Sequence, residues 1–180
     1  MDPIRVCFLQ DYRVFRKGEV YAFQGGVNLL VGDQGCGKSS MLGLLARPDP
    51  RIIHVDTGPD SLRTKFFDFE RDNPRIREFS NDPVKFKISL ASKWSSHGEF
   101  VNRIVDSIHD LDTDVVLMDE PDMALSIRSM NRLVKVLKAC TKTVIASAHN
   151  PILINAFEIV LSLEHKGWVT SREFVQLHQI

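Results

Sequence analysis

The sequence has few cysteines, no long apolar run and no excess of charge of either sign. Its three cysteines, Cys7, Cys36 and Cys140, are odd in number and widely spaced, which argues against a disulfide framework and favours a reducing compartment. Lysine plus arginine and aspartate plus glutamate both total 23, so no overall positive field points to nucleic acid. No apolar stretch approaches the ~18 residues of a membrane span, and the first residues lack a signal peptide's apolar core. We therefore expect a cytoplasmic protein with no membrane segment.

The 180 residues are expected to form one domain, from 1 to 180, in which strands and helices alternate. The continuous apolar run at 115–118 is typical of a strand buried on both faces of a parallel sheet, and residues 143–148 are expected to form the next buried strand. Two strands at 4–9 and 19–23 flank a polar turn and form an antiparallel N-terminal portion. The other expected strands lie at 27–31, 51–55, 66–70, 84–88, 158–163 and 168–177, and the helices lie at 37–47, 97–111, 126–137 and from 150 onward. The sequence therefore predicts an α/β fold with a mostly parallel central sheet.

A glycine-rich turn joins the apolar strand at 27–31 to the helix that follows it. The turn fits Gly-x-x-x-x-Gly-Lys-Ser in the strand–loop–helix context that a phosphate-binding loop requires. Glycines let successive backbone N–H groups point inward, and the helix N-terminus adds its positive end. Lys38 is expected to reach the β- and γ-phosphates, and the Ser39 hydroxyl is expected to bind Mg²⁺. The expected nucleotide-binding residues are Gly32, Asp33, Gln34, Gly35, Cys36, Gly37, Lys38, Ser39 and Ser40.

Two acidic residues, Asp119 and Glu120, directly follow the apolar run at 115–118. The carboxyl ends of parallel strands meet at one edge of a sheet, so Asp119 is expected beside the phosphate loop as a Mg²⁺ ligand. Glu120 would orient or deprotonate the water that attacks the γ-phosphate. Acidic residues also mark many ordinary strand ends, and the functional interpretation depends on the phosphate loop.

His149 follows the next apolar run, at 143–148, and is expected at the same edge of the sheet. This position indicates a contact with the γ-phosphate, whereas a lone histidine elsewhere is more often a helix cap or a partly buried side chain. The other five histidines show no ligand spacing, and no metal is assigned to them. They are His54, His97, His109, His165 and His178.

Three motifs together resemble those of an ABC-type ATPase. They are Gly-Asp-Gln-Gly-Cys-Gly-Lys-Ser-Ser at 32–40, Met-Asp-Glu-Pro-Asp-Met-Ala-Leu-Ser at 118–126 and Ser-Ala-His-Asn-Pro at 147–151. Asp-Tyr-Arg-Val-Phe at 11–15 is similar to the Asn-Phe-Arg-x-Phe opening of the SMC, RecF and OLD-like branch of that family. The resemblance covers about residues 4–163 and points to the compact ATP-binding proteins of this branch, which lack coiled-coil arms.

The resemblance implies a P-loop NTPase fold with an ABC-ATPase-like head, with ATP and Mg²⁺ as ligands. Lys38, Glu120 and His149 would be the catalytic residues, and Arg13 would lie near the phosphates. The resemblance also implies an ATP-dependent head-to-tail homodimer, in which the signature residues of one subunit contact the γ-phosphate bound by the other. The signature aligns with Ser96, His97, Gly98 and Glu99.

The sequence departs from the family pattern between the phosphate loop and the signature. No glutamine lies between Ser39 and Ser95, so the residue that usually couples Mg²⁺ to the helical lobe is missing. Glu70 and Asn73 are the candidates to replace it. Only 55 residues separate Ser39 from Ser95, which leaves room for a reduced helical insert at about 57–112 and none for coiled-coil arms.

These features favour an ATPase that drives or regulates a protein effector, with DNA metabolism or defence as candidate settings. A nucleotide-gated regulatory module with little hydrolysis is an alternative, because His97 replaces a glycine of the family signature and the glutamine is absent. A small-molecule kinase is a third hypothesis, since residues 62–78 are rich in arginine. DNA binding stays open, because basic residues could line one helix face or form an ordinary solvated surface. They are Arg128, Arg132, Lys135, Lys138 and Lys142.

Overall fold

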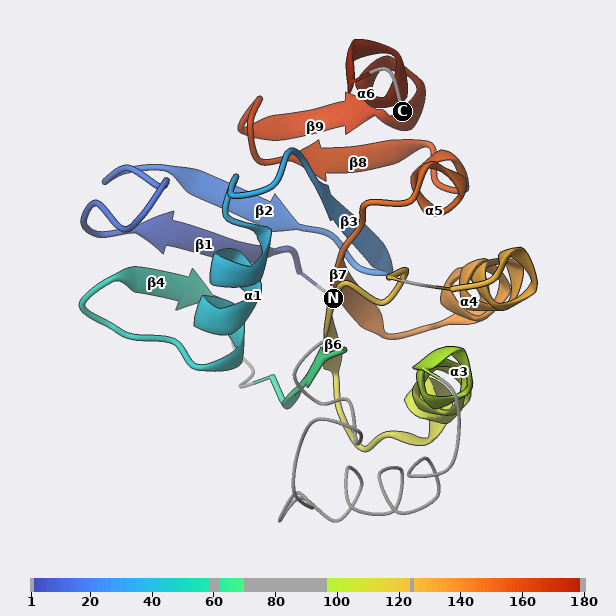
Figure 1. Cartoon of the computed structure of the whole chain (residues 1–180). Helices are drawn as coiled ribbons and strands as arrows, with labels where there is room; N and C mark the ends of the chain where they lie inside the picture. Colours follow the sequence, from blue (N-terminus) through green and yellow to red (C-terminus); the bar gives the residue numbers. More distant parts are fainter. Residues whose placement is uncertain (1, 59–61, 70–96, 124, 179–180) are drawn as a thin grey trace.

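The computed structural model describes residues 2–58, 62–69, 97–123 and 125–178, which form a layered α/β fold around a central sheet (Figure 1). Within these residues the sheet runs in the order β5 (Thr64–Asp68), β6 (Val115–Asp119), β7 (Thr143–Ser147), β3 (Val27–Val31), β8 (Ile159–Ser162) and β9 (Gly167–Thr170). Strands β5 to β8 in this order pair in parallel, and β9 pairs antiparallel with β8. The predicted α/β fold with a mostly parallel sheet is therefore confirmed.

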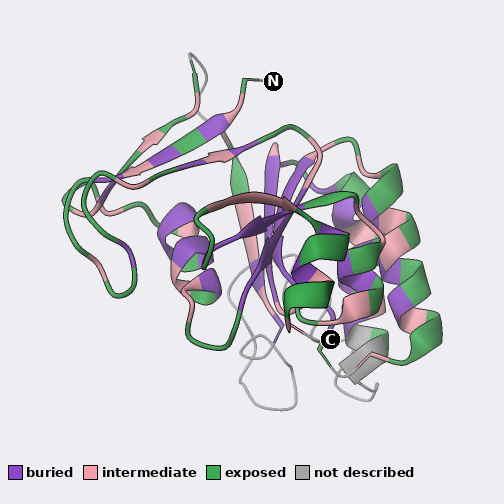
Figure 2. Ribbon diagram, turned by 90° about the horizontal axis from the view of Figure 1, so that it is seen from above, coloured by how far each residue is buried: buried purple, intermediate pink, exposed green. Residues whose placement is uncertain are grey.

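The central sheet is covered on both faces, which explains its continuous apolar strands. Along β6, Val115 and Leu117 belong to one buried apolar cluster, and Val116 and Met118 belong to another on the opposite face. This alternation is the two-residue period of a strand, with both sets of side chains buried. Figure 2 shows buried strands at the centre and helices whose outer residues are exposed. The two clusters fix the register of β6 and therefore the point at which its polar end emerges.

A separate antiparallel sheet lies on the side of the central sheet that carries helix α1 (Lys38–Ala46) (Figure 1). Its strands, in spatial order, are β2 (Val20–Phe23), β1 (Ile4–Phe8) and β4 (Ile53–Asp56). Phe8 and Phe15 stack with ring centroids 4.3 Å apart, and Tyr21 meets both rings edge-on. These rings share a buried cluster with Met41 and Leu42 of α1. The antiparallel sheet therefore supports the helix that follows the phosphate loop.

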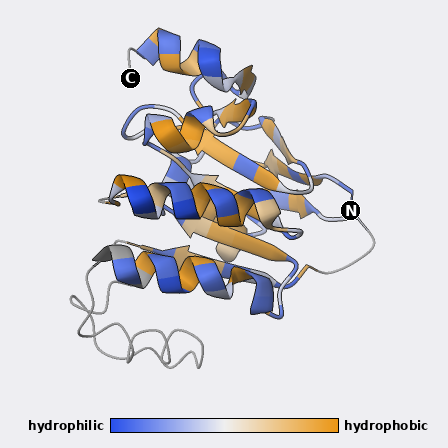
Figure 3. Ribbon diagram, turned by 90° about the vertical axis from the view of Figure 1, so that its right-hand side faces the viewer, coloured by the Kyte–Doolittle hydropathy of each residue, from blue (hydrophilic) through white to orange (hydrophobic). Residues whose placement is uncertain are grey.

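The other face of the central sheet is covered by α3 (His97–Ser107), α4 (Ile127–Ala139), α5 (Pro151–Asn155) and α6 (Ser171–His178). A 3₁₀ turn at Ile108–Asp110 extends α3. Figure 3 shows these helices from outside, with many hydrophilic residues toward the viewer. Ser126 caps α4 by accepting a hydrogen bond from the Ser129 N–H, and Asn150 caps α5 in the same way through the N–H of Ile152. The predicted starts of both helices are confirmed.

The predicted strand at 168–177 is wrong beyond its first residues. The strand is Gly167–Thr170, and the chain then turns into α6. A capping box explains the change: Thr170 Oγ1 accepts from the N–H of Glu173 at 3.2 Å, and the Glu173 carboxylate accepts from the N–H of Thr170 at 3.1 Å. Phe174 of α6 belongs to the buried cluster of the central sheet. The C-terminal helix is therefore part of the core.

Some expected features lie outside the described residues. They are the edge strand at 84–88, Ser96 at the start of the signature, and Glu70 and Asn73 as replacements for the missing glutamine. In the ranges that the structure does describe, no helix has both the length and the apolar character needed to cross a membrane.

Candidate nucleotide-binding site

The loops that follow β3, β6 and β7 leave the sheet at the same edge. These strands are parallel and adjacent, in the order β6, β7, β3, so their carboxyl ends meet (Figure 1). The edge carries the phosphate-binding loop after β3, Asp119 and Glu120 at the end of β6, and His149 just after β7. The fold therefore brings together residues that the sequence predicted to share a site.

The phosphate-binding loop depends on glycine where it enters α1. Gly37 caps the helix with a φ of 105°, and a Cβ at this position would lie 2.7 Å from Val14 and 2.8 Å from Phe15. Both the left-handed backbone and the lack of space require glycine there. Gln34 and Gly35 are exposed near the tip of the loop. The first turn of α1 reads Lys-Ser-Ser-Met, so no carboxylate from that turn competes for the positive end of the helix.

Lys38 is buried, and its ammonium group bends back onto the loop. Nζ donates to the carbonyl oxygens of Gly32 at 2.7 Å and Asp33 at 2.9 Å, and it lies 3.6 Å from Sγ of Cys36. Burial raises the pKa of the Cys36 thiol, although the nearby Lys38 opposes this effect. The ammonium group is thus held over the loop by acceptors that phosphate oxygens can replace.

The Asp119 carboxylate is held between two hydroxyl groups. Ser39 Oγ donates to Oδ1 of Asp119 at 3.1 Å, and Ser147 Oγ donates to the same oxygen at 2.8 Å. The Ser147 hydroxyl also accepts a hydrogen bond from the backbone N–H of Glu120 at 2.7 Å. Ser147 is completely buried, and hydrogen bonds to a carboxylate are stronger than neutral ones. Asp119 is thereby fixed at hydrogen-bond distance from the first turn of α1.

Glu120 and His149 face each other at this edge. Glu120 has a φ of 54°, a left-handed conformation that is uncommon outside glycine and concentrates at functional sites. Its Oε1 lies 3.3 Å from Nε2 of His149. The buried Asp122 accepts backbone hydrogen bonds through Oδ2 from His149 at 2.7 Å and from Asn150 at 2.6 Å. Asp122 therefore holds the turn that carries His149 beside Glu120.

A pocket of about 450 Å³ lies next to these residues. Its lining includes Ser39 and Ser40 of α1, Arg13, and the carboxylates of Asp68 and Asp119. Nη1 of Arg13 donates to Ser40 Oγ at 2.7 Å. Asp68 ends β5 and pairs in register with Asp119. The pocket combines hydroxyl, carboxylate and guanidinium groups, which are the ligands that phosphates and hard cations use.

The residues at Asp119 fit Mg²⁺. This ion takes hard oxygen ligands, usually one or two from the protein, and water completes its octahedron. Ser39 Oγ and Asp119 Oδ1 are such oxygens and lie 3.1 Å apart. Adjacent ligands of an octahedral ion with bonds of about 2.05 Å lie about 2.9 Å apart, so little movement is needed to hold it.

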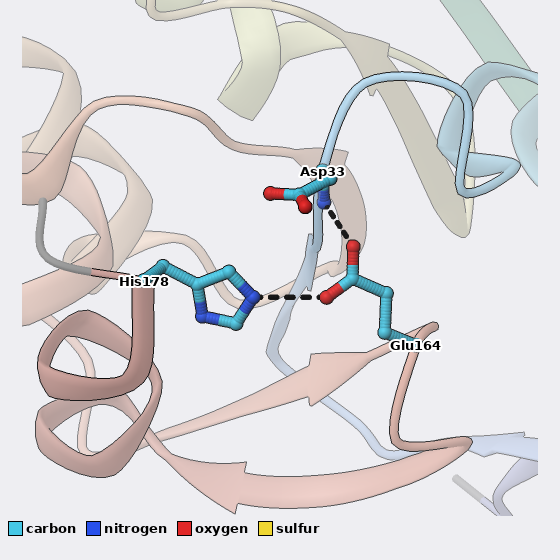
Figure 4. A group of neighbouring side chains, drawn as sticks. All are labelled: Asp33, Glu164 and His178. Carbon is cyan, nitrogen blue, oxygen red and sulfur yellow. Dashed lines mark hydrogen bonds and ion pairs between the residues drawn. The ribbon is translucent and has the colours of Figure 1, made fainter.

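A second polar group reaches the loop from the C-terminal part of the chain (Figure 4). Glu164, in the turn after β8, accepts a hydrogen bond from the backbone N–H of Asp33 at 2.6 Å and lies 2.9 Å from Nε2 of His178. Hydrogen bonds to Glu164 and to the Phe174 carbonyl oxygen raise the pKa of His178. Burial alone would raise the pKa of Glu164, but the Asp33 N–H and His178 outweigh it and lower the pKa.

The predicted signature segment lies in a different layer from the phosphate loop. Glu99 is exposed in the first turn of α3, His97 and Gly98 begin that helix, and Ser96 is not described. Helix α3 packs in the cluster on one face of the sheet, and α1 packs in the cluster on the other. Within one chain, the two segments therefore belong to opposite sides of the sheet.

The basic residues at 128–142 mostly contact the protein itself. Arg132 donates to the carboxylate of Asp106 at 3.0 and 2.6 Å, and Lys142 donates to two backbone carbonyl groups. Nζ of Lys138 lies 5.8 Å from the ring centroid of Phe157. Three of the five basic side chains thus have partners within the chain, and DNA binding by this face stays a prediction.

Four residues that touch this edge were not identified from the sequence: Asp68, Asp122, Ser147 and Glu164. Ser147 carried a usable signal, because it is a polar residue within an otherwise apolar strand. Glu164 carried none, since it meets Asp33 across 131 positions of the chain. A contact of this kind depends on strand order, which local patterns do not encode.

Comparison with known sequences gives a distant likeness. No protein-family model matches the chain. It is 27% identical over 195 aligned positions to the ATP-binding protein Uup of Buchnera aphidicola subsp. Acyrthosiphon pisum (strain APS). The alignment covers 91% of this chain and 32% of that protein, so the chain spans about a third of its relative's length.

Solved structures resemble the chain in fold. An ABC transporter in an inward-facing conformation superposes with a TM-score of 0.66 at 16% identity, over 100% of this chain and 90% of that chain. A bacterial Atm1-family ABC exporter with ATP bound gives a TM-score of 0.64 at 17% identity, over 98% of this chain and 41% of that chain. The fold is that of a P-loop NTPase. The sequence likeness to an ATP-binding protein is consistent with this fold.

Proposed function

We propose that this chain binds ATP with Mg²⁺ and hydrolyses it to ADP and phosphate. The observation that carries the proposal is the hydrogen-bonded set of Ser39, Asp119 and Ser147, at the edge where Glu120 and the phosphate loop also lie. The ATP-binding relative and the ATP-bound exporter support ATP as the nucleotide. We further infer a place in the SMC, RecF and OLD-like branch, supported by the position of Arg13 against Ser40.

In this mechanism the loop binds and orients the phosphates. Backbone N–H groups at the start of α1 donate to them, and Lys38 exchanges its contacts with Gly32 and Asp33 for phosphate oxygens. Ser39 and Asp119 would hold Mg²⁺, whose positive charge would stabilise the charge that develops on the transferred phosphoryl group.

Glu120 is the general base of the proposed reaction. It accepts a proton from water as the water oxygen bonds to the γ-phosphorus and the bond to the β–γ bridging oxygen breaks. His149 contacts Glu120 at 3.3 Å and orients its carboxylate toward the γ-phosphate. Asp122 keeps His149 in place through the backbone. Catalysis is then chiefly positioning and electrostatic stabilisation.

The proposal includes an ATP-dependent head-to-tail homodimer acting on a protein effector in the cytoplasm. The separation of the signature segment at 96–99 from the loop supports a site completed by a second subunit. Met123 and Ile127 expose 39% and 70% of their surface near the site, which supports a protein partner there. Light scattering of Glu120→Gln should show a doubled mass with ATP and a monomer without it. The same mass with and without ATP would contradict an ATP-dependent dimer.

A second candidate is a nucleotide-gated module with little hydrolysis. The absence of glutamine between Ser39 and Ser95 favours this module. A second observation also favours it: Asp68, at the end of β5, pairs in register with Asp119. A carboxylate there adds negative charge next to the proposed metal ligand. Measuring the ATPase rate against protein concentration separates the two, since activation by a second subunit predicts a more than linear rise.

Calorimetric titration tests the site itself. Wild-type protein should bind ATP more tightly with Mg²⁺ than in EDTA, and Asp119→Asn should lose that difference. Asp114→Asn is the matched control, because Asp114 lies at the opposite end of β6 and pairs with Arg63. Equal Mg²⁺ dependence in all three proteins would contradict the proposed metal ligand.

A further inference from the structure

The C-terminal helix is connected to the phosphate loop through two charged side chains (Figure 4). The connection runs from the backbone N–H of Asp33 to Glu164 Oε1 at 2.6 Å, and from Glu164 Oε2 to His178 Nε2 at 2.9 Å. His178 Nδ1 continues it to the carbonyl oxygen of Phe174 at 2.9 Å. A chain of short polar contacts therefore links α6 to the residue directly after Gly32.

Both ends of this connection are anchored in the fold. Phe174 is 3% exposed within the central cluster, and its ring stacks on His178 with centroids 4.1 Å apart. Glu164 follows Leu163, whose N–H donates to the carbonyl oxygen of Val31 at 3.1 Å. The carboxylate is thus presented by a turn that is itself bonded to the strand leading into the loop.

The two ring nitrogens of His178 both face acceptors. A neutral imidazole carries one donor and one acceptor, so it can satisfy only one of the Phe174 carbonyl and the Glu164 carboxylate. The imidazolium form donates to both. The ligand atoms of Asp33, Glu164 and His178 lie within 4.8 Å of one another, as a metal site would require. The 2.9 Å contact of Nε2 fits an N–H···O hydrogen bond, which needs only a proton between the two groups, and a metal ion there is an outcome of the test below.

We propose that Glu164 and His178 form a proton-dependent clamp that positions the phosphate loop for nucleotide binding. Both are positioning residues, since they act through the Asp33 backbone. With the proton in place, the clamp fixes the segment whose carbonyl groups hold Lys38, and the imidazolium charge offsets Glu164 close to the phosphates. When the proton leaves, the neutral ring can donate to only one of its two acceptors and Glu164 loses the neighbouring positive charge, so the clamp weakens and nucleotide affinity falls.

Other titratable groups surround the pair. From the same turn, the His165 ring lies 6.3 Å from the His178 ring, centroid to centroid. From the phosphate loop, the Asp33 carboxylate raises the pKa of His178, and the Cys36 thiol interacts with Glu164. Of these surrounding groups, the Asp33 carboxylate adds to Glu164 in favouring a cation at His178.

The test rests on the proposed function, because it measures nucleotide affinity. The affinity for a fluorescent ATP analogue with Mg²⁺ is measured between about pH 6 and about pH 9, on either side of the ordinary histidine pKa. As the pH rises across this interval, the affinity of the wild type should weaken by roughly threefold to tenfold more than that of His178→Gln. The glutamine keeps a donor to Glu164 but does not titrate. His109→Gln, at an exposed histidine, should follow the wild type. Titration of the nucleotide's own phosphates is common to all proteins and cancels in this comparison.

Identical pH profiles for the wild type and His178→Gln would overturn the clamp. Recovery of wild-type affinity at high pH on adding Zn²⁺ would also overturn it, because the three residues would then be a metal site. Hydrogen exchange of the Asp33 amide without nucleotide separates this inference from the proposed function. Faster exchange in Glu164→Ala than in wild type supports the clamp even if no ATP binds, and equal exchange contradicts it.

Discussion

The Ser147 hydroxyl donates a 2.8 Å hydrogen bond to Asp119 and simultaneously accepts one from the backbone N–H of Glu120. One buried group on β7 thus sets the position of the last residue of β6 and of the residue that follows it. Because Ser147 is 0% exposed, water cannot readily replace its hydroxyl. The proposed metal ligand and the proposed general base are therefore positioned from inside the sheet.

Replacing Ser147 with alanine should loosen both acidic residues. The partly buried N–H of Glu120 and the buried carboxylate of Asp119 each lose a hydrogen-bond partner, so the free energy of unfolding should fall by about 1–3 kcal/mol. The affinity for ATP with Mg²⁺ should fall, and the affinity in EDTA should stay the same. Denaturant titration and calorimetry measure the two effects. Thr143→Val, at the far end of β7, is the control and should leave the Mg²⁺ dependence intact.

Removing the Asp122 carboxylate should release His149. Two partly buried backbone N–H groups would lose their acceptor, and a lost hydrogen bond of this kind costs about 1 kcal/mol. In Asp122→Ala we expect a lower free energy of unfolding and a lower kcat for ATP, with KM changed little. Asp112→Ala is the control, because Asp112 is 87% exposed and pairs with Arg63 at the surface, where ion pairs contribute about 1 kcal/mol or less. Similar losses in both variants would contradict the role of Asp122.

Two glycines of the loop should respond differently to alanine. At Gly35 the φ is 86°, but the added Cβ meets none of the described atoms within 4 Å, so Gly35→Ala should cost about 1–2 kcal/mol of backbone strain. At Gly37 the same strain is joined by contacts of 2.7 and 2.8 Å with Val14 and Phe15. Gly37→Ala should therefore be clearly less stable and should lose ATP binding. Denaturation curves that coincide for the two variants would refute this reasoning.

The Glu164–His178 pair should make stability depend on pH. The pKa of His178 is raised above its ordinary value of 6.5, so its contribution is fully present below 6.5 and is lost as pH rises through the raised value. The pKa of Glu164 is lowered from 4.5, so its contribution is present above 4.5 and is lost as pH falls through the lowered value. The free energy of unfolding should decline above pH 6.5 more in wild type than in His178→Gln.

Much of the site was predictable because its residues lie within local patterns. The phosphate loop is a continuous segment, and the polar ends of β6 and β7 follow apolar runs whose burial on both faces could be expected. Parallel pairing then places Asp119, Glu120 and His149 at one edge. The roles of these residues stay predictions, since neither the fold nor the comparisons test them.

Other features depended on interactions that local patterns hide. The segment Trp168–Val169–Thr170 favours a strand, and the prediction extended it through α6 because the Thr170–Glu173 capping box was overlooked. The contact between Glu164 and Asp33 exists only because β8 lies beside β3 in the sheet. Strand order is a property of the whole chain, so this connection required the structure.

The central claim is that Glu120 activates water for ATP hydrolysis beside the phosphate loop. Its most direct test is the release of phosphate from ATP with Mg²⁺ by wild-type protein and by Glu120→Gln at equal protein concentration. Loss of a general base predicts a rate at least about 100-fold lower in the variant, while calorimetry still shows ATP binding. Hydrolysis by Glu120→Gln at the wild-type rate would contradict the account.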